Sequence, residues 1–189
     1  MEQTGTTRYW SAPTPPDLHP AETVEDPDLR ATFDYWLKLK GARRMPARSE
    51  ISPRDIKRSL RTIHIYDVVA GGADFRARLI GTGVFPGLDD DQTGKLLSDH
   101  PDPGIRLRFA VALKRVAETG EPVRSLSLRK TGDLLSNAHT EGLWLPLGDG
   151  DHVEQVLAQS SLRAIMPDNS DFAGKPEARL SRLGVAVGG

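Results

Sequence analysis

Large apolar residues recur with a helical period in two segments of the chain. In the first, four of them fall at i, i+4, i+7 and i+8 and so share one face of a helix: Leu29, Phe33, Trp36 and Leu37. Asp26 and Pro27 provide an N-cap and a first-turn proline, which predicts an amphipathic helix over 26–40. The second segment, 102–120, begins with the same Asp-Pro pair and is expected to be a central helix lying on a sheet.

Two other segments alternate with a period of two, which is typical of strands, and three later segments between short turns are also interpreted as strands. They cover residues 62–69, 75–81, 122–129, 135–147 and 152–165. In the first, His64 and Tyr66 share one face, and in the second, Phe75, Ala77 and Leu79 share one face. Short turns rich in Gly and Asp join these segments, which predicts a hairpin and then a three-stranded antiparallel meander.

The remaining segments set the boundaries of the folded part. Residues 1–25 are rich in Thr, Pro and acidic residues and have no apolar period, so we expect a flexible N-terminal lead-in. Residues 26–165 are then expected to form one α+β domain, with a short additional helix from Ser52 to about Leu60. Residues 166–189, where Gly, Pro and charge return, are expected to be a flexible tail.

Five blocks of sequence accompany these elements in order. They are YWL at 35–37 with MPAR at 45–48, RLIGTG at 78–83, TGK at 93–95, VAETGEP at 116–122 and EGLWLPL at 141–147. Together with the element order, they resemble a short alphaproteobacterial family of stand-alone domains in the PAS domain superfamily. The resemblance implies a five-stranded antiparallel sheet in the order 2-1-5-4-3, with helices on one face and the N-terminal amphipathic helix as an extra element. It implies a sensory role without indicating a cofactor or functional residues.

Composition and charge narrow the compartment and the partners. The 189 residues contain no cysteine, which excludes disulfides and thiolate metal sites, and carry a formal net charge of −1. No run of about 18 apolar residues occurs, so we expect no membrane partner and a cytoplasmic location. The segment 38–61 is strongly basic, with nine Lys or Arg against Glu50 and Asp55, or 9 − 2 = +7. No nucleic-acid motif accompanies it, so a solvated face is preferred to a nucleic-acid partner.

Motifs for metals and nucleotides fail on spacing. The five histidines are dispersed without ligand spacing, and Asp89–Asp91 lacks the alternating oxygen ligands of a calcium loop, so no metal site is expected. Gly81-Thr82-Gly83 and Gly94-Lys95 lack the glycine spacing of dinucleotide and phosphate loops.

Catalysis would need a placed carboxylate or nucleophile. Asp67 and Glu141 lie on predicted strands and are the residues that a small isomerase-like enzyme would use. A structural ion pair between Arg78 and Glu141 is the preferred interpretation, so no catalytic residue is assigned and no enzymatic activity is expected.

Two sets of residues are therefore the candidate sites. A groove between the central helix and the sheet is expected to bind a small apolar or amphipathic ligand, unless its side chains close into a core: Phe75, Leu79, Phe109, Leu113, Leu128 and Trp144. The apolar face of the N-terminal helix is the candidate interface with a second copy or a signalling protein, unless it docks on its own sheet: Leu29, Phe33, Trp36 and Leu37. The leading function is a sensory module, the alternative is a ligand-free dimerisation or interaction domain, and an isomerase-like enzyme is third.

Overall fold

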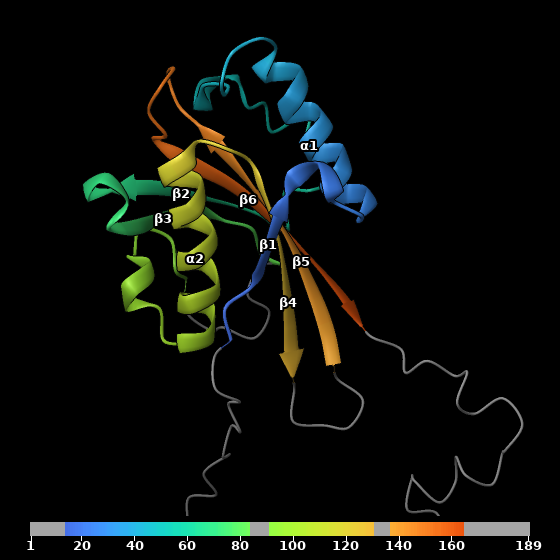
Figure 1. Ribbon diagram of the computed structural model, residues 1–189, viewed down its shortest axis with the longest axis vertical. Coiled ribbons are helices and arrows are strands. Elements are labelled where there is room, and N and C mark those ends of the chain that lie inside the picture. Colours follow the sequence, from blue (N-terminus) through green and yellow to red (C-terminus); the bar gives the residue numbers. More distant parts are fainter. Residues whose placement is uncertain (1–13, 84–90, 131–136, 165–189) are drawn as a thin grey trace, which may run out of the picture.

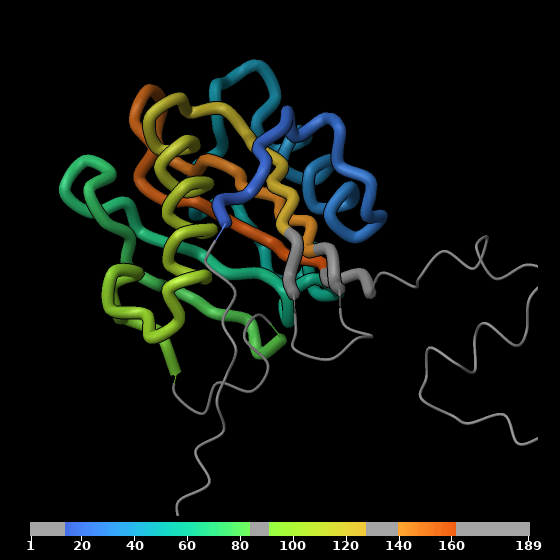
Figure 2. Tube along the Cα trace, turned by 60° about the horizontal axis from the view of Figure 1, so that its bottom comes forward, coloured from blue at the N-terminus to red at the C-terminus, as the bar shows by residue number. Residues whose placement is uncertain are grey.

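The computed structural model describes residues 14–83, 91–130 and 137–164, which form an antiparallel sheet with one α-helix on each face (Figure 1; Figure 2). The strands are β1 (Asp17–Pro20), β2 (Ile63–Val69), β3 (Asp74–Ile80), β4 (Val123–Lys130), β5 (Asn137–Leu147) and β6 (Gln155–Ala164), and the α-helices are α1 (Pro27–Lys40) and α2 (Pro103–Thr119). The sheet order is β1-β4-β5-β6-β2-β3. Short 3-10 turns occur at Ala21–Thr23, Arg48–Glu50, Ala70–Gly72 and Leu97–Asp99. The α+β prediction is confirmed.

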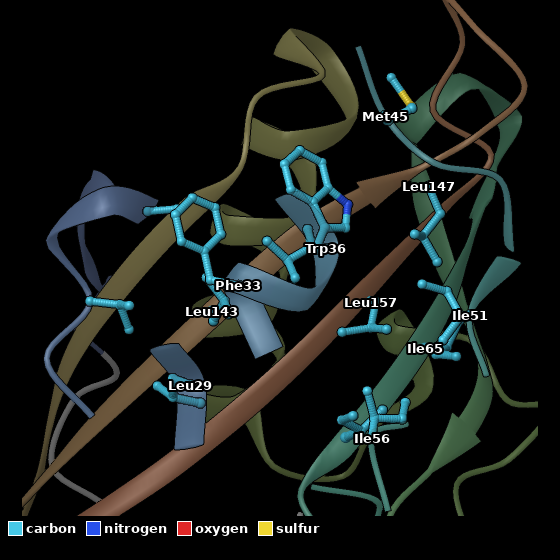
Figure 3. Close-up of a cluster of buried hydrophobic side chains, with 14 residues drawn as sticks. Leu29, Phe33, Trp36, Met45, Ile51, Ile56, Ile65, Leu143, Leu147 and Leu157 are labelled. Atoms are coloured by element: carbon cyan, nitrogen blue, oxygen red, sulfur yellow. The ribbon is translucent and has the colours of Figure 1, made fainter. Parts of the chain in front are cut away.

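Helix α1 covers one face of the sheet, which we call the α1 face. Its N-cap is Asp26, whose Oδ1 accepts hydrogen bonds from two backbone N–H groups of the first turn, and Gly41 ends it at a φ of 56°. Leu29, Phe33 and Trp36 are at most 1 % exposed, and they pack with apolar side chains from β2, β5 and β6 (Figure 3). Each such side chain contributes about 1.5–3 kcal/mol on burial, so α1 is part of the core.

Helix α2 covers the opposite face, the α2 face. Ala112, Leu113 and Val116 are fully buried there, at the helical spacing that the sequence predicts. They lie over Trp144 of β5 and over neighbouring side chains of β3, β4 and β6. The helix ends at Gly120, which takes the left-handed conformation with a φ of 65°.

The sixth strand corrects the expected five-stranded sheet. Residues 17–20, expected to belong to a flexible lead-in over 1–25, form β1 and pair antiparallel with residues 123–126 of β4. A four-residue edge strand ending in proline has too short an alternation to be recognised, and edge strands tolerate proline. Residues 1–13 and the predicted tail 166–189 lie outside the described residues.

A β-bulge between β2 and β3 corrects the expected facing of one site residue. Tyr66 pairs with Ala77 and Ile65 pairs with Leu79, so Arg78 is an extra residue in β3. Because alternate side chains point to opposite faces, the extra residue reverses the facing of those beyond it. Ala77 therefore stays in the α2-face core, whereas Leu79 lies across from Ile65 of the α1 face and is 37 % exposed.

The predicted helix over 52–60 is also wrong. The segment forms consecutive turns with i+3 hydrogen bonds, such as Ser59 N–H to the Ile56 carbonyl at 2.9 Å. Ile56 is buried in the α1-face core, and the Ser59 hydroxyl lies 3.3 Å from the Thr32 hydroxyl of α1. Tertiary anchors at every third residue favour this tighter winding over an α-helix.

Candidate functional site

A buried histidine lies among aromatic rings between α2 and the sheet. The imidazole of His64, on β2, stacks on Phe109 of α2 at a centroid distance of 5.1 Å and an interplanar angle of 18°. Tyr66 and Trp144 meet the same imidazole edge-to-face at 5.7 and 5.5 Å. Phe109 and Trp144 also contact each other at 5.1 Å, so these four side chains form a continuous group, which we call the aromatic cluster.

Burial keeps the polar members of the aromatic cluster uncharged. His64 has no exposed surface, and this burial lowers the pKa of its imidazole to about 3. Burial likewise raises the pKa of the Tyr66 phenol well above its usual range. At neutral pH the cluster therefore presents a neutral imidazole with one N–H donor and one acceptor nitrogen.

The ring nitrogens of His64 differ in their contacts. Nε2 lies 3.4 Å from the hydroxyl oxygen of Ser160, whereas Nδ1 is buried and has no hydrogen-bond partner among the residues that the structure describes. An unpaired buried polar atom costs about 1–3 kcal/mol, and such atoms in a folded protein call for an explanation. The indole N–H of Trp144, in contrast, donates to the Ser125 hydroxyl at 2.8 Å. Among the described residues, Nδ1 of His64 is therefore a fully buried atom of the cluster that lacks a hydrogen bond.

The helix that covers the aromatic cluster is only partly buried in its first half. Residues 105–111 of α2 are all partly exposed, including Phe109, whereas Ala112 and Leu113 in the next turn are fully buried. The first half is thus less buried than the turn that follows it, and Phe109 is the partly exposed member of the cluster.

The structure brings most of the predicted groove residues together. Phe75, Leu113 and Trp144 are buried in the α2-face core, with Phe109 packed against it. The prediction that Leu79 lines this site is wrong because of the bulge in β3. Ile80 contacts the α2-face core instead. Leu128 lies in β4, but its side chain is outside the described part of the structure.

Sequence reasoning missed the two polar members of the aromatic cluster. The alternation places His64 and Tyr66 on one face of a strand, but nothing in the sequence shows that this face lies under α2. The signal that could have identified them is a histidine in an otherwise apolar, β-branched strand, where burial without charge is the expected state.

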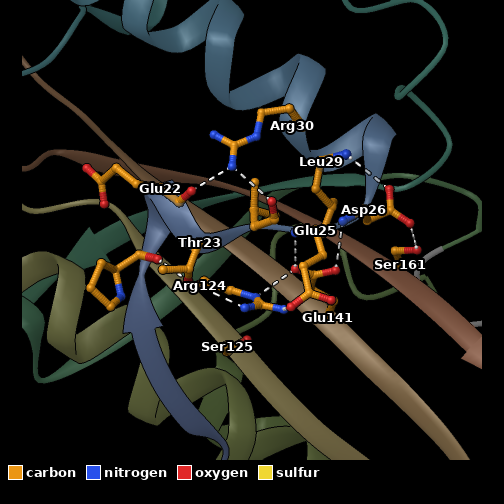
Figure 4. A network of polar contacts seen from close by, with 12 residues as sticks. Glu22, Thr23, Glu25, Asp26, Leu29, Arg30, Arg124, Ser125, Glu141 and Ser161 are labelled. Atoms are coloured by element: carbon orange, nitrogen blue, oxygen red, sulfur yellow. Dashed lines mark hydrogen bonds and ion pairs between the residues drawn. The ribbon is translucent and has the colours of Figure 1, made fainter.

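A second group of polar side chains lies on the α1 face and holds the N-terminal segment (Figure 4). The Glu141 carboxylate on β5 is 5 % exposed and accepts hydrogen bonds from the backbone N–H groups of Glu25 and Asp26 at 2.9 and 3.0 Å. The Arg124 side chain on β4, itself buried, donates from Nε to Glu141 at 2.7 Å. This network corrects the expected Arg78–Glu141 pair, because Arg78 instead lies 4.0 Å from Asp67.

The same network joins the start of α1 to the sheet. Asp26 accepts a hydrogen bond from the Ser161 hydroxyl at 2.6 Å through the carboxylate oxygen that does not cap the helix. Arg124 also pairs with Glu25 at 3.0 Å, and Arg30 donates to the carbonyls of Glu22 and Val24. Since donors occupy both Glu141 oxygens, these contacts favour a structural role over proton transfer.

The candidate interface on α1 is largely used within the chain. Leu29, Phe33 and Trp36 are buried against the sheet of their own chain, and the Trp36 indole N–H donates to the Pro146 carbonyl at 2.9 Å. Leu37 is 41 % exposed because it lies at the side of the helix face that these three residues bury. The sequence left open whether this helix forms an interface with another protein or packs on its own sheet. In the structure it packs on its own sheet.

A metal centre and a membrane span each require a particular arrangement of residues. Within the described ranges, no group of three or more His, Asp or Glu side chains is arranged to hold a metal ion. Neither described α-helix combines the length and apolarity that crossing a membrane requires.

The described residues form an antiparallel sheet with a helix packed over an aromatic interior. The PAS domain family matches residues 24–159, most of the chain, and the protein belongs to this family. No curated protein and no solved structure matches the chain. PAS domains are generally non-catalytic sensory or signalling modules.

Proposed function

We propose that this PAS domain is a sensory module that binds a small, neutral molecule between α2 and the sheet. The observation that carries the proposal is the unpaired Nδ1 of His64, fully buried among Tyr66, Phe109 and Trp144. A ligand with an apolar or aromatic body and one hydroxyl, amide or carbonyl group would satisfy that nitrogen and stack on the rings.

The chemistry of the aromatic cluster selects against charged ligands. Its lining is aromatic, and burial keeps the titratable members His64 and Tyr66 neutral. A charged ligand would lose its hydration without gaining a counter-charge, at a cost of several kcal/mol. Neutral phenols, indoles and small amides therefore fit better than acids or amines.

A response to the ligand requires movement of Phe109. Its ring stacks directly on His64, so a ligand that reaches Nδ1 displaces it together with the partly exposed first half of α2. The change in α2 is the output in this proposal, because α2 packs at once on β3, β4, β5 and β6. We place this signalling role in the cytoplasm, which fits the cysteine-free composition.

A thermal-shift screen with a matched variant tests the proposal. The full chain is heated with a panel of neutral phenols, indoles, amides and aliphatic alcohols, alongside the His64→Phe variant. We expect at least one member to raise the Tm of the wild-type chain and to have little effect on the variant, because binding stabilises only the form that offers Nδ1. A panel without any stabiliser, or equal shifts in both proteins, would exclude a ligand at His64.

A ligand-free interaction domain is the second candidate. It is favoured by the direct contact of the aromatic rings, at 5.1 Å between Phe109 and Trp144, which is the packing of a closed core. In that case the protein receives its signal at the surface. Sedimentation analysis would then show a protein complex that depends on concentration, and no compound of the thermal-shift panel would raise the Tm.

A further inference from the structure

The surface over the turns at 53–61 carries an unbalanced positive charge. Arg54, Lys57, Arg58 and Arg61 are all exposed, and among the described residues no hydrogen bond or ion pair engages their side chains. Asp55 is the one acidic residue of the segment, so these nine residues carry 4 − 1 = +3 in a chain of net charge −1. We call these four side chains the cationic surface.

The fold anchors the segment that carries these cations. Ile56 and Ser59 are buried at 7 % exposure each and face the α1-face core, whereas the cations occupy the positions between and beyond them. The Arg61 carbonyl accepts a hydrogen bond from the Gly83 N–H at 2.7 Å, which fixes the end of the segment. The cationic surface is therefore attached to a rigid support rather than to a free loop.

Of two exposed leucines, Leu60 lies within the cationic segment and Leu79 lies on the strand whose end contacts that segment. Leu60 and Leu79 are each 37 % exposed, and with Leu37 they are the large apolar residues that are most exposed in the described part of the chain. The Leu60 carbonyl lies against Gly81, two residues beyond Leu79, where a Cβ would come within 2.6 Å of it. Ile56 from the cationic segment packs in the same cluster as Ile65, the strand partner of Leu79 (Figure 3).

We propose that the cationic surface, with Leu60 and Leu79, docks an acidic segment of a partner protein that presents leucine-like side chains among its carboxylates. Charge complementarity selects an anionic partner, and the exposed leucines favour a protein segment over a nucleic acid, which would offer phosphates and no aliphatic groups. No aromatic residue interleaves with the cations, so the stacking platform of a single-strand binder is lacking. The surface is formed by residues outside the aromatic cluster, so this inference does not depend on the ligand.

Fluorescence anisotropy with the full chain tests the docking. The probe is a labelled synthetic peptide built from glutamate and leucine, compared with peptides in which serine replaces leucine or lysine replaces glutamate. The double variant Arg58→Glu with Arg61→Glu reverses two cations and should weaken binding about tenfold, since two attractions are removed and two repulsions added. Leu60→Ser should weaken it several-fold, and both sequence-altered peptides should bind less well.

A charge-matched control separates a specific surface from net charge. Lys114→Glu with Arg115→Glu changes the same number of charges on the exposed side of α2 and should leave peptide affinity unchanged. Phosphatidylserine vesicles and a short DNA duplex are titrated in parallel. Equal affinity in the wild-type and the Arg58/Arg61 variant, no peptide binding, or tighter binding of vesicles or DNA through the same arginines would overturn the proposal.

Discussion

Replacing His64 by phenylalanine should stabilise the ligand-free protein, freed of any bound molecule by unfolding and refolding, contrary to the usual effect of a core substitution. Phenylalanine keeps a flat ring between Phe109 and Trp144 and removes the unpaired Nδ1, whose burial costs about 1–3 kcal/mol. The substitution also removes Nε2, whose partner, the partly buried hydroxyl of Ser160, lies at the long distance of 3.4 Å. A net gain of about 1 kcal/mol at neutral pH is expected, or about 2–4 °C in Tm for a chain of this size.

The same substitution should change the pH dependence of stability. The pKa of His64 is about 3 in the folded chain and 6.5 in its ordinary state, so between these values the unfolded chain binds one more proton. The stability of the wild-type chain is therefore full above pH 6.5 and falls as the pH decreases toward 3. At about pH 5 the loss from this residue is about 2 kcal/mol, and phenylalanine abolishes it.

Urea unfolding at about pH 8 and about pH 5 measures both effects. The advantage of His64→Phe over the wild-type chain should grow by about 2 kcal/mol at the lower pH, since His100, whose pKa burial also lowers, contributes equally to both proteins. His152→Phe, at an exposed position of the β5–β6 turn, is the control and should show no such growth. An advantage that is the same at both pH values would refute the assignment of a neutral, buried imidazole.

Three further substitutions test other parts of the structure. Glu141→Ala leaves Arg124 buried without this carboxylate, so it should cost about 3–5 kcal/mol in urea unfolding, and hydrogen exchange should speed up at the amides of Glu25 and Asp26. Glu118→Ala, which breaks only an exposed pair with Lys114, should cost less than about 0.5 kcal/mol in the same assay. Gly120→Ala forces a left-handed residue and pushes on the Arg44 guanidinium, so it should lower stability by about 1–2 kcal/mol, measured as a reduced Tm.

Local signals in the sequence were sufficient for the two helices. Both α1 and α2 begin at an Asp-Pro pair, at 26–27 and 102–103, carry an apolar stripe and end at a glycine. Each of these signals acts within one or two helical turns. The alternation in 62–69 likewise separates the α1-face residue Ile65 from the α2-face residue Tyr66. Such features are determined by neighbouring residues, so a single sequence carries them.

The errors concern features that depend on distant partners. The bulge at Arg78 arises from the pairing of β3 with β2, and no residue in 75–81 indicates it. The alternation of the sequence therefore predicts the wrong face of the sheet for Leu79. Arg124 rather than Arg78 pairs with Glu141 because β4 lies beside β5 in the sheet. Strand β1 exists because the edge of β4 is available to it, which a four-residue segment cannot show by itself.

The candidate site was predictable in outline and not in its chemistry. Phe75, Leu113 and Trp144 could be placed under the central helix because apolar periodicity marks buried positions. That His64 would be buried with one nitrogen unpaired depends on Phe109, Trp144 and Ser160, which approach it from three other elements. Hydrogen-bond satisfaction is a property of the assembled core, so only a structure reveals it.

Native mass spectrometry of the full chain, purified gently and without denaturation, tests the sensory function most directly. A small neutral molecule bound in equal stoichiometry, released on denaturation and missing from the His64→Phe variant purified in parallel, is the predicted result. The bare polypeptide mass in both preparations, together with no stabiliser in the thermal-shift panel, would contradict a ligand beside His64 and leave protein contact as the function.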